Sequence, residues 1–151
     1  MGRADLHLHT RASDGLMSTR DLVDFVEFET DLDVIAITDH DETSASLEAR
    51  EWASRNAYRV EVIPGVEVTT RDGHMLALFV EERPPALRGM RATASWVLER
   101  GGLCLVPHPF TRWTHSLNTR VLGPAADDGL LAGVEVLNAS LAGRADRKSV
   151  V

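Results

Sequence analysis

The stretch Ala4-Asp5-Leu6-His7-Leu8-His9-Thr10, followed by Ser13-Asp14-Gly15, is the segment around which the rest of the chain is organised. Its alternation of polar and apolar residues predicts a short strand, in which side chains two positions apart share a face. His7 and His9 are therefore expected to point to the same side. Zinc binds imidazole nitrogens at about 2.0–2.1 Å, so this pair can share a cation. The same pattern also fits a strand edge that carries polar residues on its solvated face.

Length and composition predict a single soluble domain over residues 1–151. Hydrophobic residues make up 44% of the 151 positions and charged residues 26%, which is ordinary for a globular protein. The formal net charge of −7 argues against a general nucleic-acid surface but permits a bound cation. No signal core follows the N-terminus and no apolar run is long enough to cross a bilayer. We therefore expect a cytoplasmic protein without membrane contact.

Strands and helices are expected to alternate along the chain. The apolar periodicity predicts strands at 4–10, 34–37, 60–63, 66–70, 75–80, 103–106 and 133–137, and helices at 18–28, 44–56 and 90–100. Ser18 is the expected N-cap of the first helix, and Leu47, Trp52 and Ala53 are the candidate inward residues of the second. The Pro64-Gly65 pair is expected to separate two strands, and the polar segment 111–129, interrupted by Gly123-Pro124, to be a loop with at most one helical turn. Cys104 lies between apolar neighbours and is expected to be buried. This alternation predicts a mainly parallel sheet, as a barrel or a partly wound sheet.

Polar residues collect where the predicted strands end. His40, Glu67, His108 and Asn138 each follow an apolar strand, and His74 stands just before another. A single histidine at such a position is often merely exposed or hydrogen-bonded in the core. In a parallel barrel, however, the carboxyl ends of all strands lie at one mouth, where active sites are built. Five of the six histidines are therefore expected to converge.

These side chains predict a centre with more than one metal ion. Five imidazoles with Glu67 and Asp14 exceed the four ligands of a tetrahedral zinc, so two or three divalent ions are expected. Nitrogen and carboxylate ligands without thiolates suit Zn, Mn or Fe. The two oxygens of Glu67 could bridge two cations about 3.5–4 Å apart, and such a pair generates hydroxide at neutral pH. Hydrolysis, preferably of a phosphate ester, is the predicted reaction.

The ordered motifs of the chain resemble those of the PHP (polymerase and histidinol phosphatase) superfamily, and most closely its small stand-alone members. The matching motifs are the opening segment quoted above, Thr38-Asp39-His40, Gly65-Val66-Glu67-Val68, Gly73-His74 and Pro107-His108-Pro109. The resemblance implies a distorted seven-stranded, TIM-like β/α barrel that holds up to three metals. It also implies the hydrolysis of phosphate monoesters or nucleotide phosphates.

The resemblance further implies seven metal ligands in three sites. They are His7 and His9 with Glu67 bridging, then Glu67 with His74 and His108, then Asp14 with His40. Asp39 and Asp5 are expected to orient ligands from behind the metals.

The sequence departs from the family's pattern at its end. The family's closing Asp-x-His motif is missing, because Asp146 is followed two positions later by Lys148. The barrel is therefore expected to be incomplete at the C-terminus, with the second metal position best occupied. An open sheet edge also predicts a homo-oligomer or an exchange of segments between chains.

Two further residues are expected to serve a small phosphorylated metabolite or nucleotide. Arg112 could grip a phosphate through two parallel hydrogen bonds, and His115 could protonate the leaving group. Either side chain could equally be a solvated loop residue. Two other functions remain open: a carboxylic or carbamate ester hydrolase on the same site, and a catalytically impaired metal-binding structural or interaction module.

Overall fold

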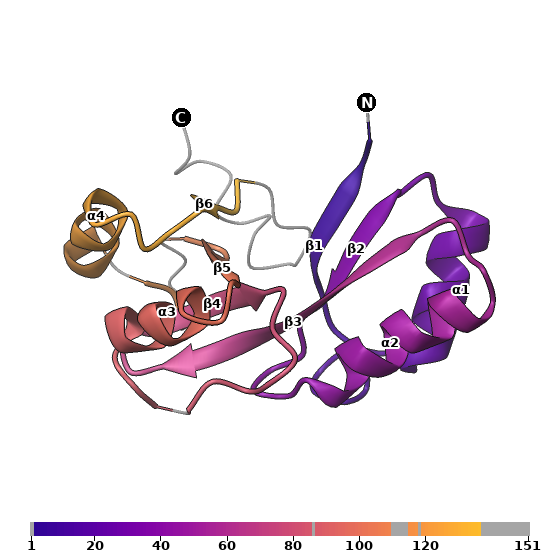
Figure 1. Ribbon diagram of the computed structural model, residues 1–151, viewed down its shortest axis with the longest axis horizontal. Coiled ribbons are helices and arrows are strands. Elements are labelled where there is room, and N and C mark those ends of the chain that lie inside the picture. The colour runs from indigo at the N-terminus through magenta and orange to yellow at the C-terminus, as the bar shows by residue number, and fades with distance from the viewer. Residues whose placement is uncertain (1, 86, 110–114, 118, 137–151) are drawn as a thin grey trace. The chain divides into compact units, whose positions relative to one another are not determined.

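The computed structural model describes residues 2–85, 87–109, 115–117 and 119–136. Helices and strands alternate along most of this part of the chain, so the fold is mixed α/β, as predicted (Figure 1). The chain divides into two compact units. One consists of the residues up to Glu67 together with 78–83, and the other of 68–77 together with the chain from Pro84 onward. The single domain over 1–151 stays a prediction.

The first unit is built on a parallel sheet. Strands β1 (Ala4–Leu8), β2 (Val34–Ile37) and β3 (Glu61–Thr70) are hydrogen-bonded in this order. Helices α1 (Thr19–Glu29) and α2 (Ser44–Arg55) connect them. Apolar side chains from both helices and from β2 and β3 form one buried cluster, against which Leu8 of β1 also packs. The parallel arrangement places the carboxyl ends of β1 and β2 at the same edge.

An N-cap on α1 and a stripe of small buried residues on α2 favour the helical conformation of these two segments. Ser18 caps α1 as predicted, because its Oγ accepts a hydrogen bond from the Asp21 amide at 3.3 Å. On α2 the buried stripe consists of small residues four positions apart, Ala45, Ala49 and Ala53, which allow close packing. Ala53 confirms one predicted inward position, while Leu47 and Trp52 are only partly buried.

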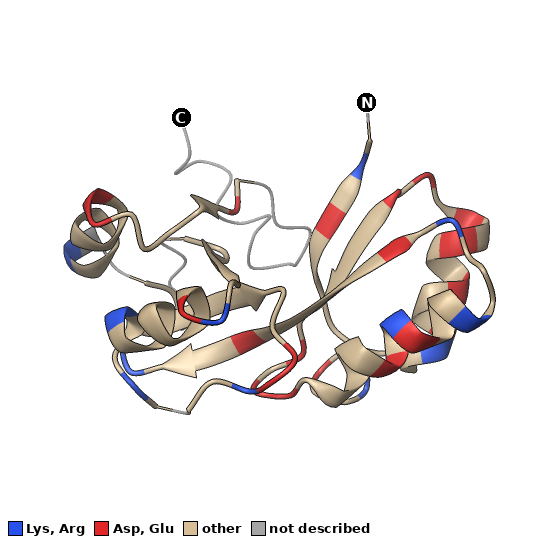
Figure 2. Ribbon diagram, viewed as in Figure 1, with Lys and Arg blue, Asp and Glu red and all other residues tan. Residues whose placement is uncertain are grey.

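The outward faces of α1 and α2 carry charges of both signs (Figure 2). Arg20 of α1 pairs with Glu48 of α2 at 2.9 Å, and Glu51 pairs with Arg55 one turn along α2 at 2.5 Å. Exposed pairs of this kind add about 0.2–1 kcal/mol at most, so the apolar cluster carries the stability of the first unit.

The second unit includes the last residues of β3, from Val68 onward. Strands β4 (Gly73–Leu78), β5 (Leu103–Val106) and β6 (Gly133–Val134) follow in this order, and β5 pairs with β6 in parallel. Helix α3 (Met90–Leu98) ends before Gly101, which has a left-handed φ of +77°. Cys104 is fully buried, as predicted, and burial raises the pKa of its thiol to about 12.

Several elements differ in extent from the prediction. The strand β3 runs through Pro64-Gly65 without a break, because extended backbone tolerates the fixed φ of proline, and Pro64 pairs with Ile37. The helix α4 (Thr119–Asp127) occupies part of the predicted loop and contains Pro124. A proline removes one amide donor from the helix, and the next residue, Ala125, is buried. Among the described residues, β6 is two residues long. In this part of the chain, none of the helices is long and apolar enough to span a membrane.

Candidate metal centre

The parallel strands of the first unit bring four predicted ligands together. His7 lies in β1, His9 follows it directly, and His40 follows β2. Glu67 lies inside β3, which joins the two strands predicted at 60–63 and 66–70. The backbone of His40 pairs with that of Glu67 in a parallel bridge, with hydrogen bonds from the Asp41 amide to the Glu67 carbonyl at 2.9 Å and from the Glu67 amide to the Asp39 carbonyl at 3.2 Å. Register therefore fixes the spacing of these side chains.

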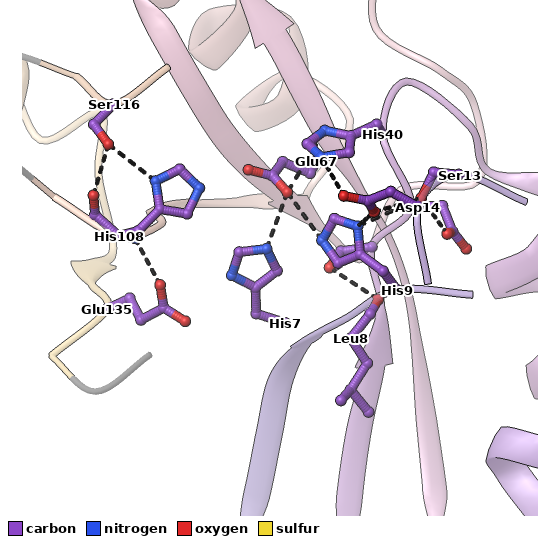
Figure 3. Close-up of polar contacts among 12 residues, drawn as sticks. His7, Leu8, His9, Ser13, Asp14, His40, Glu67, His108, Ser116 and Glu135 are labelled. Carbon is purple, nitrogen blue, oxygen red and sulfur yellow. Dashed lines mark hydrogen bonds and ion pairs between the residues drawn. The ribbon is translucent and has the colours of Figure 1, made fainter. Parts of the chain in front are cut away.

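One oxygen of Glu67 is the centre of this arrangement (Figure 3). Its Oε2 lies 3.0 Å from Nε2 of His7, 3.0 Å from Nε2 of His9 and 3.7 Å from Nδ1 of His40. Glu67 is only 1% exposed. A buried carboxylate is costly unless positive charge or hydrogen bonds compensate it, so the imidazoles stabilise it here.

The donor set fits a divalent cation. One ligand atom each from His9, His40 and Glu67 lie within 4.8 Å of one another. Imidazole nitrogens and a carboxylate oxygen suit Zn, Mn or Fe, and the carboxylate charge offsets part of the charge of the ion. His7 reaches the same Glu67 oxygen, so this side chain could join the same ligand group.

Asp14, in the loop after β1, contacts two of these histidines. Its Oδ1 lies 2.7 Å from Nδ1 of His9, and its Oδ2 lies 3.7 Å from Nε2 of His40. Burial opposes the charged form of His9, but the hydrogen bond and charge of Glu67 outweigh it and hold the pKa of His9 above its ordinary value. Burial likewise opposes ionisation of Asp14, yet the charges of His9 and His40 keep its pKa below the usual range. Asp14 and His40 therefore lie close together, and the metal site expected of them stays a prediction.

Asp39 holds the loop that carries Asp14. Its carboxylate is fully buried and accepts three hydrogen bonds from this loop, at 2.8 Å from the Thr10 amide, 2.7 Å from the Thr10 hydroxyl and 2.5 Å from the Ser13 hydroxyl. These bonds join Asp39 to the loop, and its expected role in orienting a ligand stays a prediction. Asp5 accepts a hydrogen bond from the His7 backbone amide at 3.2 Å.

The second unit gathers the other three histidines. His74 lies inside β4, whereas the sequence placed it before a strand, and His108 follows β5. The ring centroids of His74 and His108 are 5.7 Å apart, and those of His74 and the exposed His115 are 5.4 Å apart. The His74 amide donates to the His115 carbonyl at 2.6 Å. The sharing of one metal by Glu67, His74 and His108 stays a prediction.

Sequence reasoning missed two residues beside His108. Ser116 contacts both its ring and its carbonyl, and Glu135 accepts a hydrogen bond from its amide. Neither residue belongs to a motif quoted above. Arg112, which was predicted to bind phosphate, lies outside the described residues, as do Asn138 and Asp146.

A histidine pair at the end of β1, a Thr-Asp-His after β2 and a buried glutamate on β3 form the centre of a known family pattern. The family model of the PHP domain matches residues 5–110, which include all seven predicted ligands. The chain belongs to the PHP domain family. The family match spans residues of both compact units.

Curated relatives of this PHP chain differ in how much of their length it covers. MJ1587, an uncharacterised protein of Methanocaldococcus jannaschii, is 30% identical over 148 residues, which cover 91% of this chain and 82% of the relative. The 5'-3' exoribonuclease Rnm of Salmonella typhimurium is 41% identical over 58% of this chain and 31% of the relative. The 3',5'-nucleoside bisphosphate phosphatase of Chromobacterium violaceum is 32% identical over 66% of this chain and 36% of the relative. The chain thus spans about a third of the length of these two enzymes.

Solved structures share the PHP fold at low identity. A two-domain protein of Bacteroides vulgatus, described as containing a predicted PHP-like metal-dependent phosphoesterase, has a TM-score of 0.75 and 23% identity over 92% of this chain and 45% of its own. An amidohydrolase of Chromobacterium violaceum, with bound sulfate and no metal, has a TM-score of 0.68 and 16% identity. The match covers 89% of this chain and 77% of the amidohydrolase. These likenesses concern the fold.

Proposed function

We propose that this PHP chain is a metal-dependent phosphoesterase that hydrolyses phosphate esters of nucleotides or other small phosphorylated metabolites. The observation that carries the proposal is the single buried oxygen of Glu67 with imidazole nitrogens of His7, His9 and His40 within 3.7 Å of it. Such a set has the nitrogen and oxygen donors that a divalent cation needs. Membership of the PHP family supports the same assignment.

In this proposal the chain binds two to three divalent ions. The ligands are His7, His9, Asp14, His40 and Glu67 from the first unit, and His74 and His108 from the second. Bound in pairs, divalent ions acidify water and neutralise the charge of phosphate oxygens. Glu67 orients several ligands at once, while Asp39 keeps the Asp14 loop in place. We also propose that the sheet belongs to a distorted β/α barrel.

The proposed substrate class comes from the chemistry of the relatives. Relatives named as a nucleoside bisphosphate phosphatase and as exoribonucleases act on phosphate esters of nucleotides. The net charge of −7 favours small phosphate esters over long nucleic acids for this chain. Arg112 is proposed to bind the phosphate, and His115, whose ring is exposed beside His74, to donate a proton to the leaving group.

A substrate panel with added Zn, Mn or Fe tests the proposal. We expect turnover of a 3',5'-nucleoside bisphosphate and of p-nitrophenyl phosphate, loss of turnover with chelator, and loss in Glu67→Gln. Glu61→Gln, an exposed acid on the same strand, should keep the activity. Turnover of p-nitrophenyl acetate alone would identify an ester hydrolase of another class. Tight metal binding without turnover of any ester would identify a binding module.

A further inference from the structure

The side chain of Ser116 lies against His108 in the second unit (Figure 3). Its Oγ is 2.8 Å from the His108 carbonyl oxygen and 3.0 Å from Nδ1 of the His108 ring. The two residues are eight positions apart, and both are partly or fully buried. One hydroxyl therefore bridges the backbone and the ring of the same histidine.

The protons of this bridge can be assigned from the chemistry of its members. A carbonyl oxygen only accepts, so the one hydroxyl proton of Ser116 points to the His108 carbonyl. Toward the ring, the hydroxyl oxygen then acts as the acceptor. Nδ1 of His108 must supply the proton of that second hydrogen bond. A neutral ring that carries its proton on Nδ1 presents the lone pair on Nε2.

Hydrogen bonds also hold the backbone of His108. Its φ is +31°, a conformation that residues other than glycine rarely adopt. The Glu135 carboxylate accepts a hydrogen bond from the His108 amide at 2.6 Å. The Glu135 amide in turn donates to the Val106 carbonyl at 2.8 Å, which ties this carboxylate to the end of β5. Glu135 thus holds His108 at its amide, and Ser116 holds it at its carbonyl and its ring.

We propose that Ser116 is a positioning residue that fixes the Nδ1–H tautomer of His108 and so presents Nε2 as the metal-binding nitrogen. The inference rests on the proposed function, in which His108 is a metal ligand. A partner on the second ring nitrogen commonly sets both the tautomer and the orientation of a ligating histidine. In this chain a serine hydroxyl, anchored on the histidine's own carbonyl, serves that purpose.

Ring nitrogen-15 NMR of the metal-free protein tests the tautomer directly. At pH about 8.5, two units above the ordinary imidazole value, we expect the parent and Ser116→Thr to show the Nδ1–H form of His108. Ser116→Ala should show a mixture of both tautomers. Ser46→Ala is the matched control, because that hydroxyl also donates to a backbone carbonyl, of Thr43 at 2.9 Å, but on α2. An unchanged Nδ1–H signal in Ser116→Ala would overturn the inference.

Metal titration by calorimetry separates this inference from the proposed function. Ser116→Ala should weaken binding at the His108 site by about 10–100-fold, with Ser116→Thr close to the parent. Should Ser116→Ala fail to fold, Ser116→Val against Ser116→Thr repeats the comparison at matched shape. If His108→Ala binds metal like the parent, the ligand assignment of the proposed function fails. If His108→Ala loses metal while Ser116→Ala keeps both tautomer and affinity, the Ser116 inference alone fails.

Discussion

A single carboxylate oxygen organises the candidate centre at the scale of one residue. Glu67 is buried, and its Oε2 faces three imidazoles, which lie at the end of β1 and in the segment after β2. An amide of the same shape would offer one neutral oxygen and a nitrogen donor, so it could not balance the charge of a cation. The charge of Glu67, more than its size, should therefore matter.

We expect Glu67→Gln to weaken the binding of Zn or Mn by at least about 100-fold, beyond the range seen when a residue behind a ligand is lost. Glu61→Gln, on the exposed start of the same strand, should bind metal like the parent. Isothermal titration with each metal measures both variants. Equal affinities in the two variants would contradict the assignment of Glu67 as a ligand.

At the scale of elements, the loop after β1 depends on a close backbone approach at Gly15. A Cβ at this position would lie 2.2 Å from the His9 carbonyl oxygen and 2.7 Å from the Thr10 amide nitrogen. The Gly15 amide also donates to the Thr10 carbonyl at 2.8 Å. Any side chain here would push apart the segments that carry His9 and Asp14.

We expect Gly15→Ala to destabilise the fold by about 1–3 kcal/mol and to weaken metal binding with it. Gly133→Ala, in β6, is the matched control, since a Cβ there meets only the Leu105 side chain, at an ordinary contact distance of 3.4 Å. That variant should stay within about 0.5 kcal/mol of the parent, because it removes no contact and creates no clash. Urea unfolding of both variants gives the free energies. Equal losses of stability in the two variants would refute the steric argument.

The attachment of α1 to the start of β3 predicts a pH dependence. Glu27 accepts hydrogen bonds from the backbone amides of Arg59 at 3.1 Å and Val60 at 3.0 Å, one on each oxygen. These bonds, that of Arg59 first, lower the pKa of Glu27 below its ordinary value of 4.5. Because the folded-state pKa is lowered, the stabilisation is present above pH 4.5 and is lost as the pH falls through the folded value.

We therefore expect Glu27→Gln to be less stable than the parent at pH 7, with a difference that shrinks as the pH falls below 4.5. Glu29→Gln, an exposed acid at the end of the same helix, serves as the control. Urea unfolding at several pH values between about 3 and 7 measures the effect, since the relevant range surrounds the ordinary glutamate value. A difference that grows in acid would show that the sign is wrong.

At the scale of the whole molecule, metal binding and folding should be linked. The proposed ligands come from segments far apart in sequence, so the unfolded chain does not preform the site. A ligand that binds only the folded state stabilises it by about 2.7 kcal/mol at 100 times its dissociation constant. The expected oligomer and cytoplasmic location stay predictions at this scale.

We expect added Zn or Mn to raise the melting temperature of the parent, chelator to reverse the rise, and Glu67→Gln to show little of it. The rise should shrink in acid, because protonated imidazoles cannot bind a cation. Calorimetric melting with and without metal makes the comparison. A rise of the same size in Glu67→Gln would place the stabilising metal elsewhere on the chain.

The sequence by itself determined the candidate ligands, the alternation of helices and strands, and local features such as the Ser18 cap. These depend on side-chain periodicity and on neighbours within one turn of helix, which the order of residues contains directly. It did not reveal that β3 continues through Pro64 or that α4 forms around Pro124. At both positions local propensity was outweighed by pairing and burial that involve other segments.

Only the tertiary structure decided which atoms meet. Three arrangements depend on contacts between positions far apart in sequence. Three histidines surround one oxygen of Glu67, Asp39 accepts hydrogen bonds from the Thr10 loop, and His108 is hydrogen-bonded to Ser116 and Glu135. Strand register sets these distances, and a shift of one residue would turn each side chain to the opposite face. The chemistry of the candidate centre was thus readable from residue types, and its geometry from the packed chain alone.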